Sequence, residues 1–129
     1  MRFTYQCPIR WSDMDAFGHV NNARFLTLYE EARVALMFKG GLDSLSRGVV
    51  ISRHEVDYLR PVDYGDAVRI ELWISELRAA SFTVSYELFD GDVLASRAKS
   101  VCVPFNLAKQ FPRRLSEAEK DFLKPYQES

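Results

Sequence analysis

One segment of the chain, residues 22–38, is apolar over most of the circumference of a helix. Its polar side chains fall on a narrow stripe, with a single arginine off it: Arg24, Thr27, Glu30, Glu31 and Arg33. A helix of this kind is expected to be buried rather than laid on a surface. Gly40 and Gly41 end it. The rest of the chain must therefore cover one long helix from nearly every side.

The segments on either side of this helix alternate between apolar and polar residues, which is typical of strands. The alternating segments are residues 2–10, 50–58, 68–75, 82–89 and 93–103. A parallel doubly wound fold would need a helix between successive strands, so that fold is excluded. The sequence predicts an α+β fold in which an antiparallel sheet of five strands curls around the central helix.

Two strand features carry more specific predictions. Asp90 and Gly91 favour a type I′ hairpin, because both central residues of that turn need positive φ. In the strand that follows the helix, Val50, Val56 and Tyr58 are expected to share one face.

The last strand and the tail also carry predictions. One face of the last strand has nearly all small residues, which indicates a close approach of the helix: Leu94, Ser96, Ala98, Ser100 and Cys102. Ser116 and Glu119 have the spacing of a capping box, and they predict a short helix that ends near Leu123.

The composition limits the choice of partners. The chain has 129 residues with 17 basic and 18 acidic side chains, a net charge of −1. One domain spanning residues 1–129 is expected at this length. Near neutrality gives no overall attraction to nucleic acid or to an anionic membrane. No stretch reaches the roughly 20 apolar residues needed to span a bilayer, so neither nucleic-acid nor membrane partners are expected.

The two cysteines, Cys7 and Cys102, share no metal-ligand spacing and have no neighbouring His or Cys to complete a zinc site. We interpret both as buried thiols, and we expect neither a metal nor a cofactor. Residues 1–11 lack the apolar core of a signal peptide. The expected location is therefore a reducing cytoplasm.

The apolar helix also predicts an oligomer. A single sheet covers only one side of a helix, so a second subunit is needed to close the structure. The sequence predicts a homo-oligomer and leaves open whether it is a homodimer or a homotetramer.

A polar segment between the first strand and the helix collects groups that can do chemistry: Asp13, Asp15, Gly18, His19, Asn21 and Asn22. The first N–H groups of a helix lack intrahelical acceptors, and the helix dipole adds positive charge there, so a developing oxyanion is stabilised. Asn21 or Asn22 is a good N-cap, and Gly18 can take the positive φ that folds the loop back. A carboxylate just upstream would lie beside a site for an electrophile.

Each of these residues also has a structural interpretation. Asp and Asn before a helix commonly serve as caps, and a lone histidine is commonly a hydrogen-bonded loop residue. We interpret Asp13 as structural. The whole run and its position, rather than any one residue, favour a site.

Two runs of residues can be compared with known families. The first comprises Trp11, Asp13, Asp15, Gly18, His19, Val20, Asn21, Asn22, Phe25, Leu26, Tyr29, Glu31, Ala32 and Arg33. The second comprises Tyr58, Leu59, Arg60, Pro61, Val62, Tyr64, Gly65 and Asp66. Together they resemble the signature of hotdog-fold acyl-CoA thioesterases of the 4-hydroxybenzoyl-CoA thioesterase type. Phe25 is a departure, because many relatives have tyrosine there.

The resemblance implies a hotdog fold in which sheets of paired subunits become continuous and active sites lie at the subunit interface. It implies hydrolysis of an acyl-CoA to a free acid and CoA. The catalytic carboxylate falls on Asp15, as general base or nucleophile, and the oxyanion donor is a backbone N–H at about Asn22. His19 is expected to orient water or to hold the loop.

CoA carries phosphates, so its binding needs basic side chains. We expect Gly18, Asn21 and Arg60 near the substrate. The family tends to place phosphate contacts near the turn that holds Arg78 and Ser81, so the resemblance adds these two residues.

Two other functions remain open. A hotdog dehydratase or hydratase would pair a catalytic histidine with an acid, and the chain has only His19 and His54. A non-catalytic acyl-CoA-binding module would keep the pocket but lose the carboxylate. The acyl group, and whether CoA or acyl carrier protein carries it, are also left open.

Overall fold

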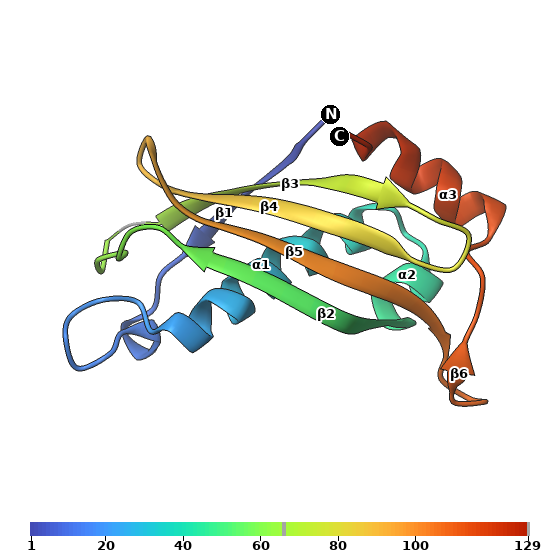
Figure 1. The fold of residues 1–129 in the computed structure, drawn as a ribbon, viewed down its shortest axis with the longest axis horizontal. Coiled ribbons are helices and arrows are strands. Elements are labelled where there is room, and N and C mark those ends of the chain that lie inside the picture. Colours follow the sequence, from blue (N-terminus) through green and yellow to red (C-terminus); the bar gives the residue numbers. More distant parts are fainter. Residues whose placement is uncertain (66, 129) are drawn as a thin grey trace.

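The computed structural model describes residues 1–65 and 67–128, so the Asp66 of the second run lies outside the described residues. An antiparallel sheet curls around one long helix, α1 (Figure 1). The strands and helices are β1 (Phe3–Pro8), α1 (Asn22–Lys39), α2 (Asp43–Arg47), β2 (Val49–Tyr58), β3 (Ala67–Leu77), β4 (Phe82–Asp90), β5 (Val93–Asn106), β6 (Phe111–Pro112) and α3 (Glu117–Leu123). The strand order is β1-β3-β4-β5-β2, and the short β6 pairs with β5. The predicted α+β architecture is confirmed.

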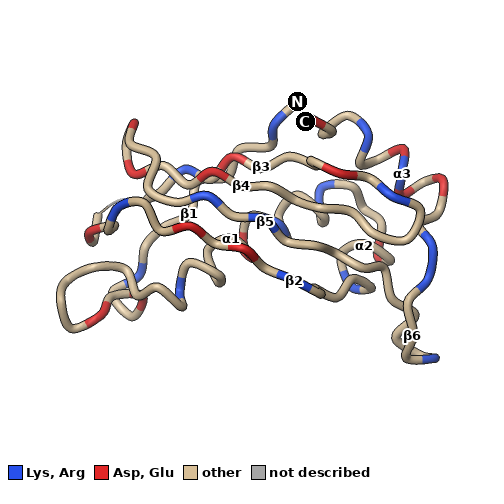
Figure 2. The backbone as a smooth tube through the Cα atoms, viewed as in Figure 1, with Lys and Arg blue, Asp and Glu red and all other residues tan. Residues whose placement is uncertain are grey.

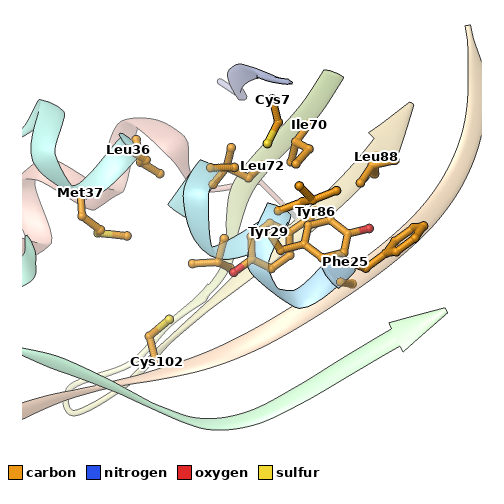
Figure 3. Packing of buried hydrophobic residues seen from close by; sticks show 14 of the residues in the cluster. Cys7, Phe25, Tyr29, Leu36, Met37, Ile70, Leu72, Tyr86, Leu88 and Cys102 are labelled. Carbon is orange, nitrogen blue, oxygen red and sulfur yellow. The ribbon is translucent and has the colours of Figure 1, made fainter. Parts of the chain in front are cut away.

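The predicted central helix is also confirmed. Aromatic and aliphatic side chains of α1 point into the concave side of the sheet, where Tyr29 and Tyr86 place their ring centroids 4.7 Å apart (Figure 3). Leu26, Val34 and Phe38, on the same helix, remain exposed. The sheet therefore leaves part of an apolar helix uncovered, as the sequence pattern indicates.

Strand alternation places the core as expected in β3. Val68, Ile70, Leu72 and Ile74 are all 1 % exposed or less. Their neighbours on the strand face outward, which is the period of two that a half-buried strand requires. This face of β3 packs beneath α1 and fixes the helix over the sheet.

The hairpin between β4 and β5 differs from its prediction by one residue. Asp90 pairs with Val93, so the two-residue loop is Gly91 and Asp92. Gly91 has φ +62°, whereas Asp92 is not among the described residues with positive φ. Glycine at the first central position with an ordinary second residue is typical of type II′, and the expected type I′ turn was wrong.

The expected face of β2 is interrupted by a bulge. Ile51 pairs with Cys102 and Arg53 pairs with Val101, so one residue of β2 is left unpaired between them. A bulge of one residue inverts the alternation beyond it. Val50 therefore does not share a face with Val56 and Tyr58, because the pattern changes phase between them.

The small residues of β5 do not bring the helix backbone close. The helix approaches β1 and β3 most closely, and large side chains fill the space over β5. The Tyr29 hydroxyl donates a hydrogen bond of 2.6 Å to Ser96, and Tyr86 donates one of 2.9 Å to Ser100. Small residues on β5 thus accommodate two buried tyrosines rather than a helix.

The tail forms the predicted capped helix, α3. Ser116 accepts a hydrogen bond from the N–H of Glu119, and the Glu119 carboxylate accepts one from the N–H of Ser116. Glu119 is 1 % exposed and forms two 2.8 Å hydrogen bonds with the Arg113 guanidinium. This pair anchors the tail beside α2, a helix that the sequence pattern did not predict.

Acidic and basic residues are interspersed along the strands of the sheet (Figure 2). Glu55 of β2 lies opposite Lys99 of β5, and Asp57 lies opposite Arg97. These positions give the described part of the sheet charges of both signs. Within the part of the chain that the structure describes, no helix is both long and apolar enough to cross a membrane.

Candidate active site

The polar loop between β1 and α1 is tied to the segment that follows β2. Val20 donates a backbone hydrogen bond of 2.7 Å to Val62, and His19 forms an antiparallel bridge with Asp63. Two runs that are roughly 40 residues apart in the chain therefore become neighbours at the start of the helix. This contact creates the site.

Asp13 stabilises this loop through hydrogen bonds to neighbouring residues. Its carboxylate is 1 % exposed and accepts hydrogen bonds from the Arg10 N–H at 2.8 Å and from the Arg10 guanidinium at 3.2 Å. Burial would raise the pKa of Asp13, but the hydrogen bonds from Arg10 outweigh it and lower the pKa. The Asp13 carbonyl accepts the N–H of Asn21 at 2.8 Å. This geometry fits a structural role.

Asp15 is held differently. Its Oδ1 accepts the backbone N–H groups of Phe17 at 2.8 Å and of His19 at 3.2 Å. Gly18 makes the tight return possible with φ +80°, a region that other residues rarely adopt. Two backbone donors fix the carboxylate through Oδ1, and Oδ2 has no hydrogen-bond partner among the described residues.

The helix begins directly after this turn. Asn21 is the N-cap, and its side chain accepts the N–H of Ala23 at 2.9 Å. Asn22 is the first residue of α1, so its N–H lacks an intrahelical acceptor and lies at the positive end of the helix dipole. An oxyanion placed here would be stabilised by both effects.

A cavity of about 260 Å³ joins these groups. Its walls include Asp15 and Asn22 on one side and residues from the end of β2 on the other. Tyr58 packs edge-on against Phe25 with ring centroids 5.1 Å apart, and its hydroxyl donates a 2.9 Å hydrogen bond to the Asn22 carbonyl. The aromatic pair provides apolar contact next to the polar helix start.

Two further predicted residues line the same cavity. His19 lines the cavity, and its Nε2 lies 3.5 Å from the Asp63 carboxylate. Arg60 is exposed and forms no ion pair with any described residue. An exposed, unpaired guanidinium beside a cavity is suited to a phosphate.

A larger hollow of about 540 Å³ lies on the outer face of the sheet. Its charged groups include Arg53 and Glu55, which are paired at 2.6 Å. It contains neither a helix start nor a carboxylate held by backbone N–H groups. The smaller cavity is therefore the better candidate for chemistry.

The structure does not bring Arg78 and Ser81 to this cavity. They belong to the turn between β3 and β4, where the Arg78 N–H bonds the Ser81 carbonyl. The Asp15 loop lies near the opposite end of β3, roughly 33 Å away for about ten residues at about 3.3 Å each. Arg78 also pairs with Glu76. Within one subunit, Arg78 and Ser81 therefore do not line this cavity, because they lie at the other end of β3; their contact with CoA stays a prediction.

Sequence reasoning also missed the part that Tyr58 plays. The second run includes Tyr58, but a tyrosine in a strand gives no sign that its hydroxyl will reach a helix carbonyl. The usable signal is the bridge between the two runs, which only the fold reveals.

Comparisons with known proteins agree on one family. The family model described as the thioesterase-like superfamily matches residues 9–125. A 1,4-dihydroxy-2-naphthoyl-CoA hydrolase from Synechococcus elongatus is 32 % identical over 94 % of this chain and 94 % of its own. Its similarity extends across the whole domain.

Solved structures give the same result. A predicted thioesterase from Bacillus stearothermophilus has a TM-score of 0.92 and 27 % identity, over 100 % of this chain and 98 % of its own. A thioesterase complexed with coenzyme A and Zn from Thermus thermophilus has a TM-score of 0.84 and 30 % identity, over 95 % of this chain and 92 % of its own. The expected hotdog fold is confirmed, and the chain belongs to the thioesterase-like superfamily.

Proposed function

We propose that this chain hydrolyses acyl-CoA thioesters, with Asp15 as the catalytic carboxylate and the N–H of Asn22 as an oxyanion donor. One observation carries the proposal: the Asp15 carboxylate, held by two backbone N–H groups, shares a cavity of about 260 Å³ with the first residue of α1. The thioesterase family and a CoA-bound relative supply the reaction class.

The reaction needs an attacking oxygen and a site for negative charge. With Asp15 as general base, its carboxylate takes a proton from water while the water oxygen bonds to the thioester carbon. The carbonyl oxygen becomes an oxyanion at the Asn22 N–H. The C–S bond then breaks, and the CoA thiolate leaves with the proton that Asp15 had taken.

With Asp15 as nucleophile, a carboxylate oxygen bonds to the thioester carbon and the thiolate leaves. Water then hydrolyses the resulting anhydride and regenerates Asp15. Both routes use the same oxyanion donor and yield the same products. Label found in the Asp15 carboxylate after a single turnover in ¹⁸O-labelled water would establish the nucleophile route, because water has then opened the anhydride at the aspartyl carbon.

Other residues support these steps. Gly18 shapes the turn that presents Asp15, and Asn21 caps the helix whose end binds the oxyanion. His19 is in position to orient water at the rim. Arg60 is proposed to meet a CoA phosphate.

We also propose that the protein works as a homodimer or homotetramer. Strand β2 is ten residues long and forms an edge of the sheet, and Leu26 and Val34 of the adjacent helix are 37 % exposed. Such an edge is a template for pairing with another chain. A second copy would also be the source of Arg78 and Ser81 if they contact CoA. A monomer in light scattering at micromolar concentration would refute this.

The proposed location is the cytoplasm, because Cys7 and Cys102 are free thiols inside the core and free buried thiols are typical of a reducing compartment.

Thiol release from a panel of acyl-CoAs, aliphatic and aromatic, tests the proposed activity. We expect wild-type turnover of at least one member and its loss in Asp15→Asn, with the same circular dichroism spectrum. Release from acyl carrier protein thioesters is measured in parallel, to identify the carrier. No thiol release from any thioester would refute hydrolysis. CoA binding without interconversion of enoyl-CoA and 3-hydroxyacyl-CoA would then support the acyl-CoA-binding module.

The dehydratase alternative is tested in the same preparation. Enoyl-CoA and 3-hydroxyacyl-CoA are followed by absorbance of the conjugated double bond, with saturated acyl-CoA as the control. Interconversion of the first two without thiol release would favour that alternative over hydrolysis.

A further inference from the structure

A second cavity, of about 370 Å³, lies farther along α1. Most of its lining is apolar and comes from the second half of the helix, α2 and β2, among them Val34, Met37 and Ile51. Val34 and the β2 edge also belong to the proposed subunit contact, so a partner copy would border this cavity. Among the described lining residues, the polar ones are Ser46, whose hydroxyl donates to the Asp43 carbonyl, and the ion pair of Arg33 with Glu30. A cavity with one charged position in an apolar wall can select a ligand by the placement of a single polar group.

Arg33 is 7 % exposed, yet few of its guanidinium N–H groups have a hydrogen-bond partner among the described residues. Its Nη1 donates a 3.0 Å hydrogen bond to the Tyr86 hydroxyl, whose own proton goes to Ser100 at 2.9 Å. Its Nη2 lies 3.6 Å from the Glu30 carboxylate, beyond hydrogen-bond distance. The remaining guanidinium N–H groups form no hydrogen bond with the described residues. These nitrogen atoms are not fully buried, so a ligand in the cavity can accept their hydrogen bonds.

The ion pair offers a donor beside an acceptor. A plain alkyl chain would desolvate both charges and replace no hydrogen bond, which is costly. A carboxylate would meet Arg33 but be repelled by Glu30. A hydroxyl can accept from Arg33 and donate to Glu30 at once. The pair therefore matches a neutral hydroxyl better than either alternative.

The two cavities lie along the same two elements. The first is lined by Asn22 and Tyr58, and the second by Glu30 and Ile51, so both follow α1 in one direction and β2 in the other (Figure 1). About eight residues of helix separate Asn22 from Glu30, about 12 Å at about 1.5 Å per residue. An extended acyl chain whose carbonyl is at Asn22 is long enough to span this distance.

We propose that the Arg33–Glu30 pair is a specificity site for a hydroxyl group in the middle of a long acyl chain, with the apolar remainder of the chain in the second cavity. This inference rests on the proposed thioesterase function, since that function places the carbonyl at Asn22. The pantetheine arm of CoA is a poorer occupant, because its two amides would face walls that are mostly apolar.

The test compares CoA thioesters of one chain length. Stearoyl-CoA is measured against analogues with a hydroxyl on the third or the tenth carbon, the tenth lying about as far from the carbonyl as the pair. We expect kcat/KM to favour the tenth-carbon analogue by about tenfold over stearoyl-CoA, the ratio that one net hydrogen bond supplies. The third-carbon analogue should gain nothing. Equal rates for all three would overturn the proposal.

Variants test whether the Arg33–Glu30 pair causes the preference for the tenth-carbon hydroxyl. Glu30→Gln removes the negative charge at an exposed position, so it should fold, and it should reduce the roughly tenfold ratio to about twofold. Glu31→Gln is the matched control on the next residue and should keep the ratio. Arg33→Lys is the second variant, with its folding checked by circular dichroism; it should also lower the ratio. A uniform effect of Glu30→Gln on all three thioesters would place CoA itself at the pair and refute the assignment.

Measuring the binding of free fatty acids tests this inference independently of the hydrolytic function on which it rests. Calorimetry with free stearic acid and free 10-hydroxystearic acid needs no hydrolysis. If no thioester is hydrolysed but the hydroxy acid binds more tightly, and Glu30→Gln removes the difference, the proposed function fails and the site stands. If thioesters are hydrolysed and the two acids bind equally, the site fails and the function stands.

Discussion

Asp13 and Asp15 are the same side chain two positions apart, and the fold treats them in opposite ways. Asp13 is buried, and its bonds to Arg10 use both of its oxygens. Asp15 is half-buried beside a cavity, and its hydrogen bonds come from two backbone N–H groups to one oxygen. Both oxygens of Asp13 take part in structural hydrogen bonds, whereas Oδ2 of Asp15 remains available to a ligand.

The difference shows what positions a reactive group. A partner with opposite charge neutralises a carboxylate, whereas backbone donors in a tight turn orient it and leave its charge uncompensated by a side chain. Proximity in sequence therefore does not imply a shared role. The variants below test this separation, from the largest expected effect to the smallest.

Asp15→Asn should lower kcat by about 10²–10⁴-fold, the usual contribution of a positioned acid or base. Asparagine keeps the oxygen that accepts the two N–H groups, so the free energy of unfolding should stay within about 0.5 kcal/mol of wild type. Steady-state thiol release and urea denaturation measure the two quantities. Retained turnover would remove Asp15 from the mechanism.

Glu119→Gln extends the comparison to a second buried carboxylate, far from the cavity. Burial would raise the pKa of Glu119, but its bonds to Arg113 and to the Ser116 N–H lower the pKa from 4.5 to about 2. A lowered pKa stabilises the folded state above about pH 4.5, and that contribution is lost as the pH falls toward about 2. The variant should lose up to about 3 kcal/mol at about pH 7.

Urea denaturation at several pH values checks this prediction. The wild-type free energy of unfolding should fall between about pH 4.5 and about pH 2, and the slope should be shallower in Glu119→Gln. Asp121→Asn, at an exposed neighbour on the same helix, is the control. Equal slopes for wild type and Glu119→Gln would show that this ion pair does not govern acid stability.

Asp13→Ala should reduce the free energy of unfolding by about 1–3 kcal/mol, because two hydrogen bonds from Arg10 to a buried, charged carboxylate are lost. The kcat of the folded fraction should change much less than in Asp15→Asn. A loss of kcat as large as that of Asp15→Asn, without a stability change, would erase the distinction between the two residues.

Tyr58→Phe removes one hydroxyl and leaves the ring against Phe25. The lost hydrogen bond to the Asn22 carbonyl corresponds to about 0.5–1.5 kcal/mol. We expect kcat to fall several-fold through a less fixed helix start, with KM nearly unchanged. Phe25→Leu, which removes the aromatic contact instead, is the comparison; a change in KM alone for Tyr58→Phe would indicate direct substrate contact.

Much of the fold follows from sequence periods. The helix and the strands were predictable because their alternation is long and regular, and the capped tail helix because Ser116 and Glu119 specify it. The phase change in β2 was not, since a bulge has no residue signature there. The turn at Gly91 was misread by one position, because glycine serves either type II′ or type I′.

The site divides along similar lines. Asp15, Gly18 and Asn21 are local, so their turn and cap could be predicted from neighbouring residues. Contacts between residues far apart in the chain could not be predicted. The sequence pattern places Arg33 outside the polar stripe of the helix. It gives no sign that the Tyr86 hydroxyl accepts a hydrogen bond from Arg33.

Helix α1 is held at both ends by other parts of the chain. At its start the Tyr58 hydroxyl bonds the Asn22 carbonyl, and at its end Gly40 lies so close to the Phe122 ring that an added Cβ would be 2.8 Å away. One residue of an α-helix turns it by about 100°. An insertion or deletion inside α1 therefore cannot satisfy both ends, and length variation in this protein should be confined to its loops.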